Sequence, residues 1–132
     1  MANFVTWDYS CPGISFQVGR GKIGIFKQTL MAMGSPEYFH FLLSPADKKF
    51  GIEPCGIDDE GAKHLRSEID EEYNEVSCIN LVRYVYKVCG WDRTISYRVP
   101  GRIYSSDSRL VYFDLQKALE IHEGRLMKIE KQ

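Results

Sequence analysis

The sequence has no long apolar run and no surplus of one charge, and each absence removes a class of protein. Nowhere do about 18 apolar residues follow one another, which excludes a membrane-spanning helix. The 17 basic residues are balanced by 18 acidic ones, so bulk positive charge does not favour nucleic acid. Binding of nucleic acid would have to come from a local patch of basic residues.

Signals of export and of cysteine chemistry are also missing. Met1–Phe4 lack the basic and apolar regions of a secretory signal, so we expect a cytoplasmic protein. The four cysteines, Cys11, Cys55, Cys78 and Cys89, form no C-x-x-C pair, and we expect neither a zinc knuckle nor a redox motif. In the cytoplasm they are expected to be reduced thiols, and a disulfide is the alternative.

Motifs of catalysis and metal binding are absent as well. No Ser or Cys lies in a G-x-S-x-G context. Gly19 and Gly21 form a G-x-G fragment, but the third glycine and long helix of a phosphate-binding loop are missing. His40 has no Cys or carboxylate at a metal-ligand spacing. We therefore predict that the protein is not an enzyme and needs neither a metal nor a cofactor.

Hydrophobic residues are plentiful enough for a core. They make up 44% of the chain, which fits a single compact domain over residues 1–132. Alternating apolar residues predict strands at 14–18, 23–25, 38–43 and 49–53. Residues 28–33 predict a short helix that Gly34 and Pro36 end. The first part of the chain therefore reads as a strand, a short helix and a hairpin.

Residues 56–76 form an acidic connector. Ala62, Leu65, Ile69 and Tyr73 recur at three- and four-residue spacing, which predicts a surface helix, and the acids of 68–75 would be its solvated face.

The strand, helix and hairpin pattern returns after this connector. We expect a strand at 79–81, a helix at 83–89 that Gly90 ends, and hairpin strands at 94–99 and 110–113. Asp114 can cap a final helix over 115–122, and the charged tail to Gln132 is expected to fray.

The two units can be aligned residue by residue. Ile23 and Ile25 fall on Ile79 and Leu81, Gly34 falls on Gly90, and Phe50 and Ile52 fall on Val111 and Phe113. We therefore predict a duplication, with a first repeat at 13–55, the connector at 56–76, and a second repeat with its C-terminal helix at 77–122. One such unit cannot bury a core alone, whereas two packed about a pseudo-two-fold axis can.

The first repeat resembles the AbrB-like swapped-hairpin domain. The resemblance is carried by Gly21–Lys27, Met33–Gly34, Tyr38–Leu43 and Phe50–Pro54, against a family pattern of G-R-[IV]-x-I-P-K, a short helix ending in L-G, and a hairpin ending near a proline. Two fused copies look like the arrangement of MraZ proteins. The resemblance implies a mainly β fold with short helices, a pseudo-two-fold duplicated swapped-hairpin β-barrel. It also implies a DNA-binding transcriptional regulator or antitoxin-like protein that needs no cofactor.

The candidate DNA-contacting residues flank the first loop and the two short helices: Arg20, Lys22, Lys27, Arg83 and Lys87. Gathered on one face, they would contact phosphates of double-stranded DNA. The alternative is that they are ordinary solvated charges.

The sequence also departs from the family pattern. Phe26 and Val82 replace the family proline, and Leu30-Met31 replaces the basic pair of the first helix. These departures motivate a second function hypothesis, a protein-interaction or oligomerisation module that kept the fold and lost DNA binding. Its partner would be a second copy or another protein, and in neither hypothesis a membrane.

Tyrosines and arginines are interleaved around the second hairpin. The residues concerned are Arg98, Arg102, Arg109, Tyr97, Tyr104 and Tyr112. Such a mixture can form a stacking surface for single-stranded nucleic acid. The alternative is that the tyrosines are cross-strand packing pairs.

Overall fold

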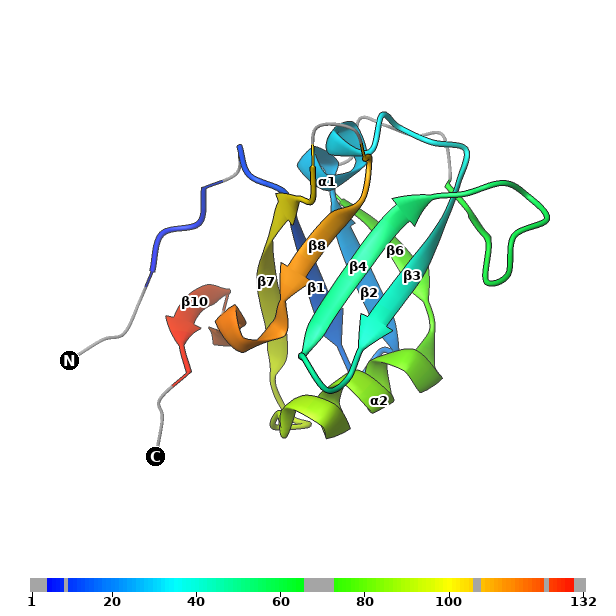
Figure 1. The fold of residues 1–132 in the computed structure, drawn as a ribbon. Helices are drawn as coiled ribbons and strands as arrows, with labels where there is room; N and C mark the ends of the chain where they lie inside the picture. Colours follow the sequence, from blue (N-terminus) through cyan, green and yellow to red (C-terminus); the bar gives the residue numbers. More distant parts are fainter. Residues whose placement is uncertain (1–4, 9, 66–72, 106–107, 123, 130–132) are drawn as a thin grey trace.

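The computed structural model describes residues 5–8, 10–65, 73–105, 108–122 and 124–129. Figure 1 shows a curled antiparallel sheet that forms half of a barrel, with α1 at one end and α2 at the other. The strands are β1 Gly13–Gln17, β2 Lys22–Phe26, β3 Tyr38–Ser44, β4 Lys49–Pro54, β5 Lys63–His64, β6 Tyr73–Ser77, β7 Ser96–Ile103, β8 Val111–Asp114, β9 Leu119–His122 and β10 Arg125–Lys128. The helices are α1 Lys27–Ala32, α2 Ile79–Cys89 and the 3-10 helix η1 Leu115–Lys117.

The strand order brings distant parts of the chain together. Along the sheet it is β5-β3-β4-β8-β7-β1-β2-β6, and every pair is antiparallel. β7 pairs with β8 along one stretch and with β9 along the next, and β10 adds to β9. The β3–β4 hairpin therefore joins the β7–β8 hairpin through the β4–β8 pair.

The core fills the concave side of the sheet. Alternate residues of the strands point inward and are fully buried, among them Ile14, Phe16, Ile23, Ile25, Ile52, Val99, Val111 and Phe113. α2 adds Val82, Val85 and Tyr86, and the α1 end of the barrel adds Leu30 and Met33. The helices are therefore held by burial of their apolar faces, since most helical stability in proteins comes from such packing.

The predicted mainly β fold with short helices is confirmed. The strands expected in the first part of the chain correspond to β1, β2, β3 and β4, with small shifts at their ends. The short helix is present as α1, and Gly34 follows it at a φ of +80°, a conformation that favours glycine. The hairpin strands of the second part are β7 and β8.

The expected strand at 79–81 is wrong, because these residues form the first turn of α2. Val82, Val85 and Tyr86 recur at three- and four-residue spacing and are buried on one side of the helix. Burial of this face outweighs the weak helix preference of the β-branched residues. Gly90 ends the helix in the left-handed conformation, as predicted.

The connector and the C-terminal segment also differ from expectation. The two ends of the expected connector helix are strands, since β5 adds to β3 and β6 adds to β2; the middle of that predicted helix, 66–72, lies outside the described residues. Asp114 does cap a helical turn, accepting a hydrogen bond from Gln116 N, but the turn ends at Lys117. β9 follows this turn because residues 119–122 pair with the edge of β7. Residues 125–128, which were expected to fray, form β10 and pair with β9.

The side chain of Thr29 in α1 forms hydrogen bonds with β1, close to the point where β2 ends and α1 begins. The β1–β2 pairing ends at Ile14 and Ile25, so Gly13 lies beyond it. The buried Thr29 hydroxyl donates to Gly13 O and accepts from Gly13 N, both at 2.8 Å. One side chain therefore satisfies both backbone groups that the ladder leaves free.

We expect Thr29→Val to lower the free energy of unfolding by about 2–4 kcal/mol, because it leaves two buried backbone groups unsatisfied. Urea denaturation would measure the change. Thr29→Ser is the matched control and should lose about 1 kcal/mol or less, since it keeps the hydroxyl and removes one methyl group. Equal losses in the two variants would contradict this account of the Thr29 hydrogen bonds.

Candidate nucleic-acid interface

The turn between β1 and β2 packs against the start of α2. Cys78 N donates to Gly21 O at 2.9 Å, directly before the helix. Gly21 has a φ of +63°, and a Cβ there would lie 2.7 Å from Ile79 Cβ. Only glycine fits this contact, which brings Arg20 and Lys22 to the same end of the barrel as α2.

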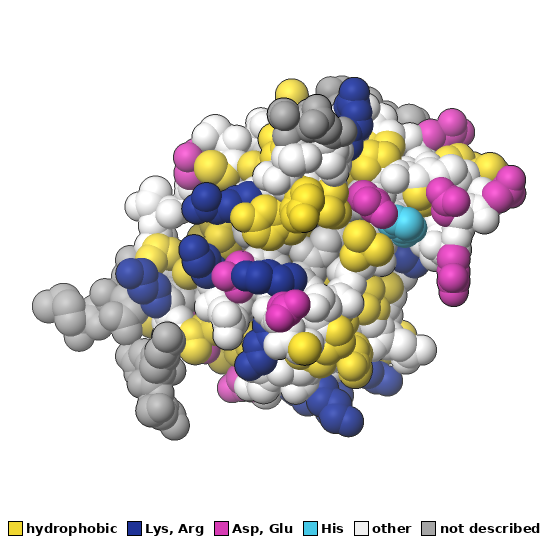
Figure 2. Space-filling model, viewed as in Figure 1, with side chains coloured by type: hydrophobic (Ala, Val, Ile, Leu, Met, Phe, Trp, Pro, Cys, Tyr) yellow, Lys and Arg dark blue, Asp and Glu magenta, His cyan; other side chains and the backbone are white. Residues whose placement is uncertain are grey.

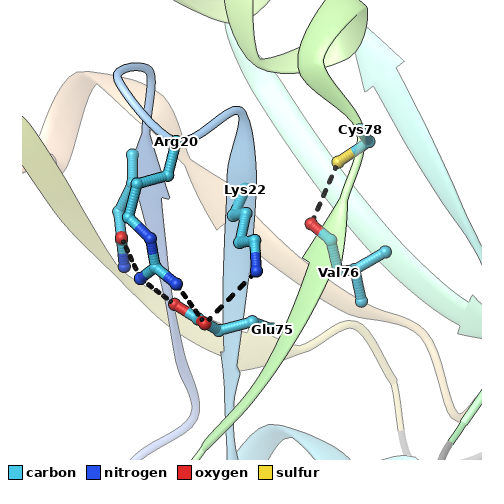
Figure 3. A network of polar contacts seen from close by, with 6 residues as sticks. Arg20, Lys22, Glu75, Val76 and Cys78 are labelled. Atoms are coloured by element: carbon cyan, nitrogen blue, oxygen red, sulfur yellow. Dashed lines mark hydrogen bonds and ion pairs between the residues drawn. The ribbon is translucent and has the colours of Figure 1, made fainter.

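Glu75 of β6 holds the two cations of this turn (Figure 3). Arg20 forms two hydrogen bonds with the Glu75 carboxylate, at 2.6 and 2.8 Å, and Lys22 Nζ lies 3.8 Å from Glu75 Oε1. Gln17 Oε1 accepts a further bond from Arg20 at 3.0 Å. The Arg20 side chain is 53% exposed, so the ion pair stabilises the fold by at most about 1 kcal/mol. Its main effect is to cancel positive charge.

The outward face of α2 carries exposed cations. Arg83 and Lys87 lie one turn apart and are exposed, and Tyr84 beside them is 47% exposed. Neither cation forms an ion pair with any described residue, and α2 contains no acidic residue. Dark-blue side chains lie along the lower edge of Figure 2, where Figure 1 has α2. α2 therefore presents a basic and aromatic surface to solvent.

The structure separates Lys27 from the other four candidate residues. Lys27 is the first residue of α1, which lies at the opposite end of β2 from Lys22. In Figure 1, α1 and α2 cap opposite ends of the half-barrel. Arg20, Lys22, Arg83 and Lys87 thus share one end, and Lys27 does not belong to it.

The tyrosines of the second hairpin pack against other aromatic rings. Tyr97 is buried and stacks on Trp91 at a centroid distance of 4.3 Å, and Tyr104 contacts Tyr112 edge-on at 6.2 Å. The Arg98 guanidinium lies over the rings of Trp7 and Phe26, 5.2 and 4.8 Å from their centroids. These contacts favour the packing interpretation over a single-strand stacking surface.

No group of three His, Cys, Asp or Glu among the described residues could hold a metal ion. A hollow of about 830 Å³ beside the end of α2 carries Asp92 and Glu120, but Thr94 binds Asp92 and His122 binds Glu120.

The four cysteines are free, as expected for reduced thiols. Burial raises the pKa of Cys89 to about 11, so its thiol is uncharged near neutral pH and a poor nucleophile.

Glu75 is the residue of this end that the sequence did not single out. It was expected on the solvated face of a connector helix, yet in β6 it faces the β1–β2 turn. The register that pairs Glu75 with Gly24 places it one strand from the cations. The residues 73–77 show no alternation of apolar and polar side chains, so the local sequence carried no signal for this strand, and the helix-like spacing of the connector indicated a different structure.

Three comparisons, with protein-family models, with curated proteins and with solved structures, find no match to this chain. No helix formed by the described residues is long and apolar enough to cross a membrane. A functional hypothesis for this chain therefore depends on its own residues and their geometry.

His40 provides a test of local electrostatics on the convex side of the sheet. Its Nε2 lies 2.7 Å from Glu53 Oε1, and this hydrogen bond raises the pKa of His40 above 6.5. We expect NMR titration to show the raised pKa of His40 and Glu53→Gln to lower it. The stabilisation should be complete below about pH 6.5 and be lost as pH rises through the folded-state pKa. An unaltered His40 titration in Glu53→Gln would contradict this assignment.

Proposed function

We propose that the chain is a DNA-binding protein of the regulator or antitoxin-like kind, built from two AbrB-like swapped-hairpin units. The observation that carries DNA binding is the outward face of α2, where Arg83 and Lys87 are exposed and form no ion pair with any acidic residue that the structure describes. Such side chains bind DNA phosphates and release the counterions that are condensed on the DNA. They therefore give affinity for DNA even where the net charge of the protein is near zero.

The strand pairing supports a duplicated unit. If β1-β2-α1-β3-β4 corresponds to β5-β6-α2-β7-β8, then β2 and β6 are equivalent and pair with each other, and so do β4 and β8. The remaining cross-pairs exchange partners: β1 pairs with β7, and β5 pairs with β3. A pseudo-two-fold axis requires this reciprocity.

The registers support the same correspondence. Phe50 pairs with Phe113, and Ile52 pairs with Val111. Because the alignment matches Phe50 with Val111 and Ile52 with Phe113, each residue lies opposite the counterpart of the other. Within the hairpins, Leu43 pairs with Phe50 and Ile103 pairs with Val111. Leu43 therefore matches Ile103. In this correspondence the second repeat begins with β5, inside the segment 56–76 first interpreted as a connector, and not at 77.

The shape of α2 suits double-stranded DNA. Its 11 residues make a rod about 16 Å long. An α-helix fits the major groove, which is about 12 Å wide. Tyr84 lies between the two cations, where its side chain can contact a sugar or a base edge.

The alternative function, an interaction or oligomerisation module without DNA binding, is favoured by Glu75. Its carboxylate occupies Arg20 and Lys22, so only part of the predicted basic set is free. The two functions differ in one measurable property, salt-dependent affinity for duplex DNA.

We expect the purified protein to bind a mixed-sequence 20-base-pair duplex in fluorescence anisotropy, with an affinity that falls steeply with salt. Arg83→Ala/Lys87→Ala should reduce the slope of log affinity against log salt by about 2, because two phosphate contacts are lost. Lys27→Ala removes a cation at the other end of the barrel and is the matched control. Equal effects of the double variant and the control would refute the α2 interface, and no binding by the parent protein would favour the alternative function.

Glu75→Gln should strengthen DNA binding about three- to tenfold at low salt, because it frees Arg20 and Lys22 and removes a negative charge near the phosphates. The same titration measures the change. Glu37→Gln, which removes an exposed carboxylate between α1 and β3 at the other end of the barrel, is the control and should have little effect. Weaker binding by Glu75→Gln would show that the Arg20 pair positions the interface instead of masking it.

A further inference from the structure

The convex side of β3, β4, β8 and β7 has an apolar centre. Along one row of the sheet, Leu42 pairs with Gly51, Gly51 with Tyr112, and Tyr112 with Arg102. These side chains alternate with the buried core residues and therefore face outward. Leu42 is 39% exposed and Tyr104, which packs on Tyr112, is 66% exposed. The convex side of a sheet that faces water is usually polar, so this apolar centre is unusual.

The apolar centre is a groove and not a flat surface. Its volume is about 460 Å³, and Gly51 lies at its floor with Leu110 and Leu42 on either side. A Cβ at position 51 would lie 3.2 Å from Leu110 Cδ1, so the side chains of Leu110 and Leu42 pack directly against the backbone of Gly51. Figure 2 shows patches of yellow side chains over the strands of the face that it presents.

The two ends of the groove carry opposite charge. At the β3 end lie Glu53 and the exposed acids Asp58, Asp59 and Glu60 of the β4–β5 loop. At the β7 end lies Arg102, which is exposed and forms no ion pair with a described residue. In Figure 2, magenta side chains gather on the side of the β4–β5 loop, and dark-blue side chains gather on the side of β7.

We propose that this face, made by the outward residues of β3, β4, β8 and β7, binds the same face of a second copy of the chain. A two-fold axis in the interface, parallel to the strands, lays the β3 end of one copy over the β7 end of its partner. Each copy then places Arg102 opposite the partner's acidic end, and the two apolar centres cover each other. The charge distribution of this single face is therefore complementary to itself.

Self-complementarity is the reason to prefer a second copy over an unrelated protein. An isologous interface requires a surface that is complementary to itself. Here both charges occur on the same face with the groove between them. This inference does not rest on DNA binding, because its residues lie on the side of the half-barrel and α2 lies at its end.

The first test is the oligomeric state of the full chain. We expect sedimentation equilibrium to show a dimer at about 100 μM, and Leu42→Asp to weaken the dimer at least about tenfold, because it buries a charge in an apolar contact. Leu42 is partly exposed, and circular dichroism checks that the variant is folded. Met31→Asp, at an exposed position of α1 outside the groove, is the matched control and should remain dimeric.

The second test is charge reversal. Arg102→Glu and Glu53→Arg should each weaken the dimer, and the double variant should recover most of the loss, because the reversed charges again meet opposite signs. A monomeric parent protein would overturn the proposal, whether or not the groove binds some other protein. So would Leu42→Asp that dimerises like the parent, or a double variant weaker than both single variants. Loss of DNA binding alone, with the dimer intact, would refute the α2 interface and leave this proposal standing.

Discussion

The pairing of β4 with β8 is the contact on which the rest of the structure depends. It places Phe50 opposite Phe113, and Phe50 also contacts the rings of Phe16 and Phe41 at 5.3 and 5.4 Å. The two hairpins are thereby joined into one sheet with one aromatic centre. The curl of that sheet in turn sets both ends of the half-barrel, where α1 and α2 bury their apolar faces. On the outer side, the same pair places Gly51 beside Tyr112 and forms the groove.

The sequence was most informative where the pattern was local. Alternation found β1 to β4, and Gly34 and Gly90 marked the ends of α1 and α2, because a left-handed residue after a helix favours glycine. Prediction failed at 79–81 and 115–122, where short apolar segments suit both a helix and a strand. In both places a contact with a distant part of the chain determines the structure. The residues of α2 are helical because one face packs in the core, and those of β9 are extended because they pair with the edge of β7.

The candidate interface was predictable as a set of residues but not as a surface. Basic side chains near the short helices are visible in the sequence, whereas the place of α2 depends on the antiparallel pairing of β6 with β2. That pairing puts Ser77, and with it the start of α2, beside Lys22, while β2 carries the chain to Lys27 at the other end. The contact between Arg20 and Glu75 joins residues far apart in the chain and follows from the β2–β6 register, which no local pattern specifies.

The two proposed surfaces are geometrically compatible. A two-fold axis parallel to the strands preserves position along the strands, so both copies of α2 would lie at the same end of the dimer. DNA-binding dimers read two half-sites on one side of a duplex, which requires their recognition elements to face the same way. An axis across the strands would instead place the two α2 helices at opposite ends, and the acidic ends of the groove would face each other. The axis that the charges favour is therefore also the one that allows a single duplex to contact both helices.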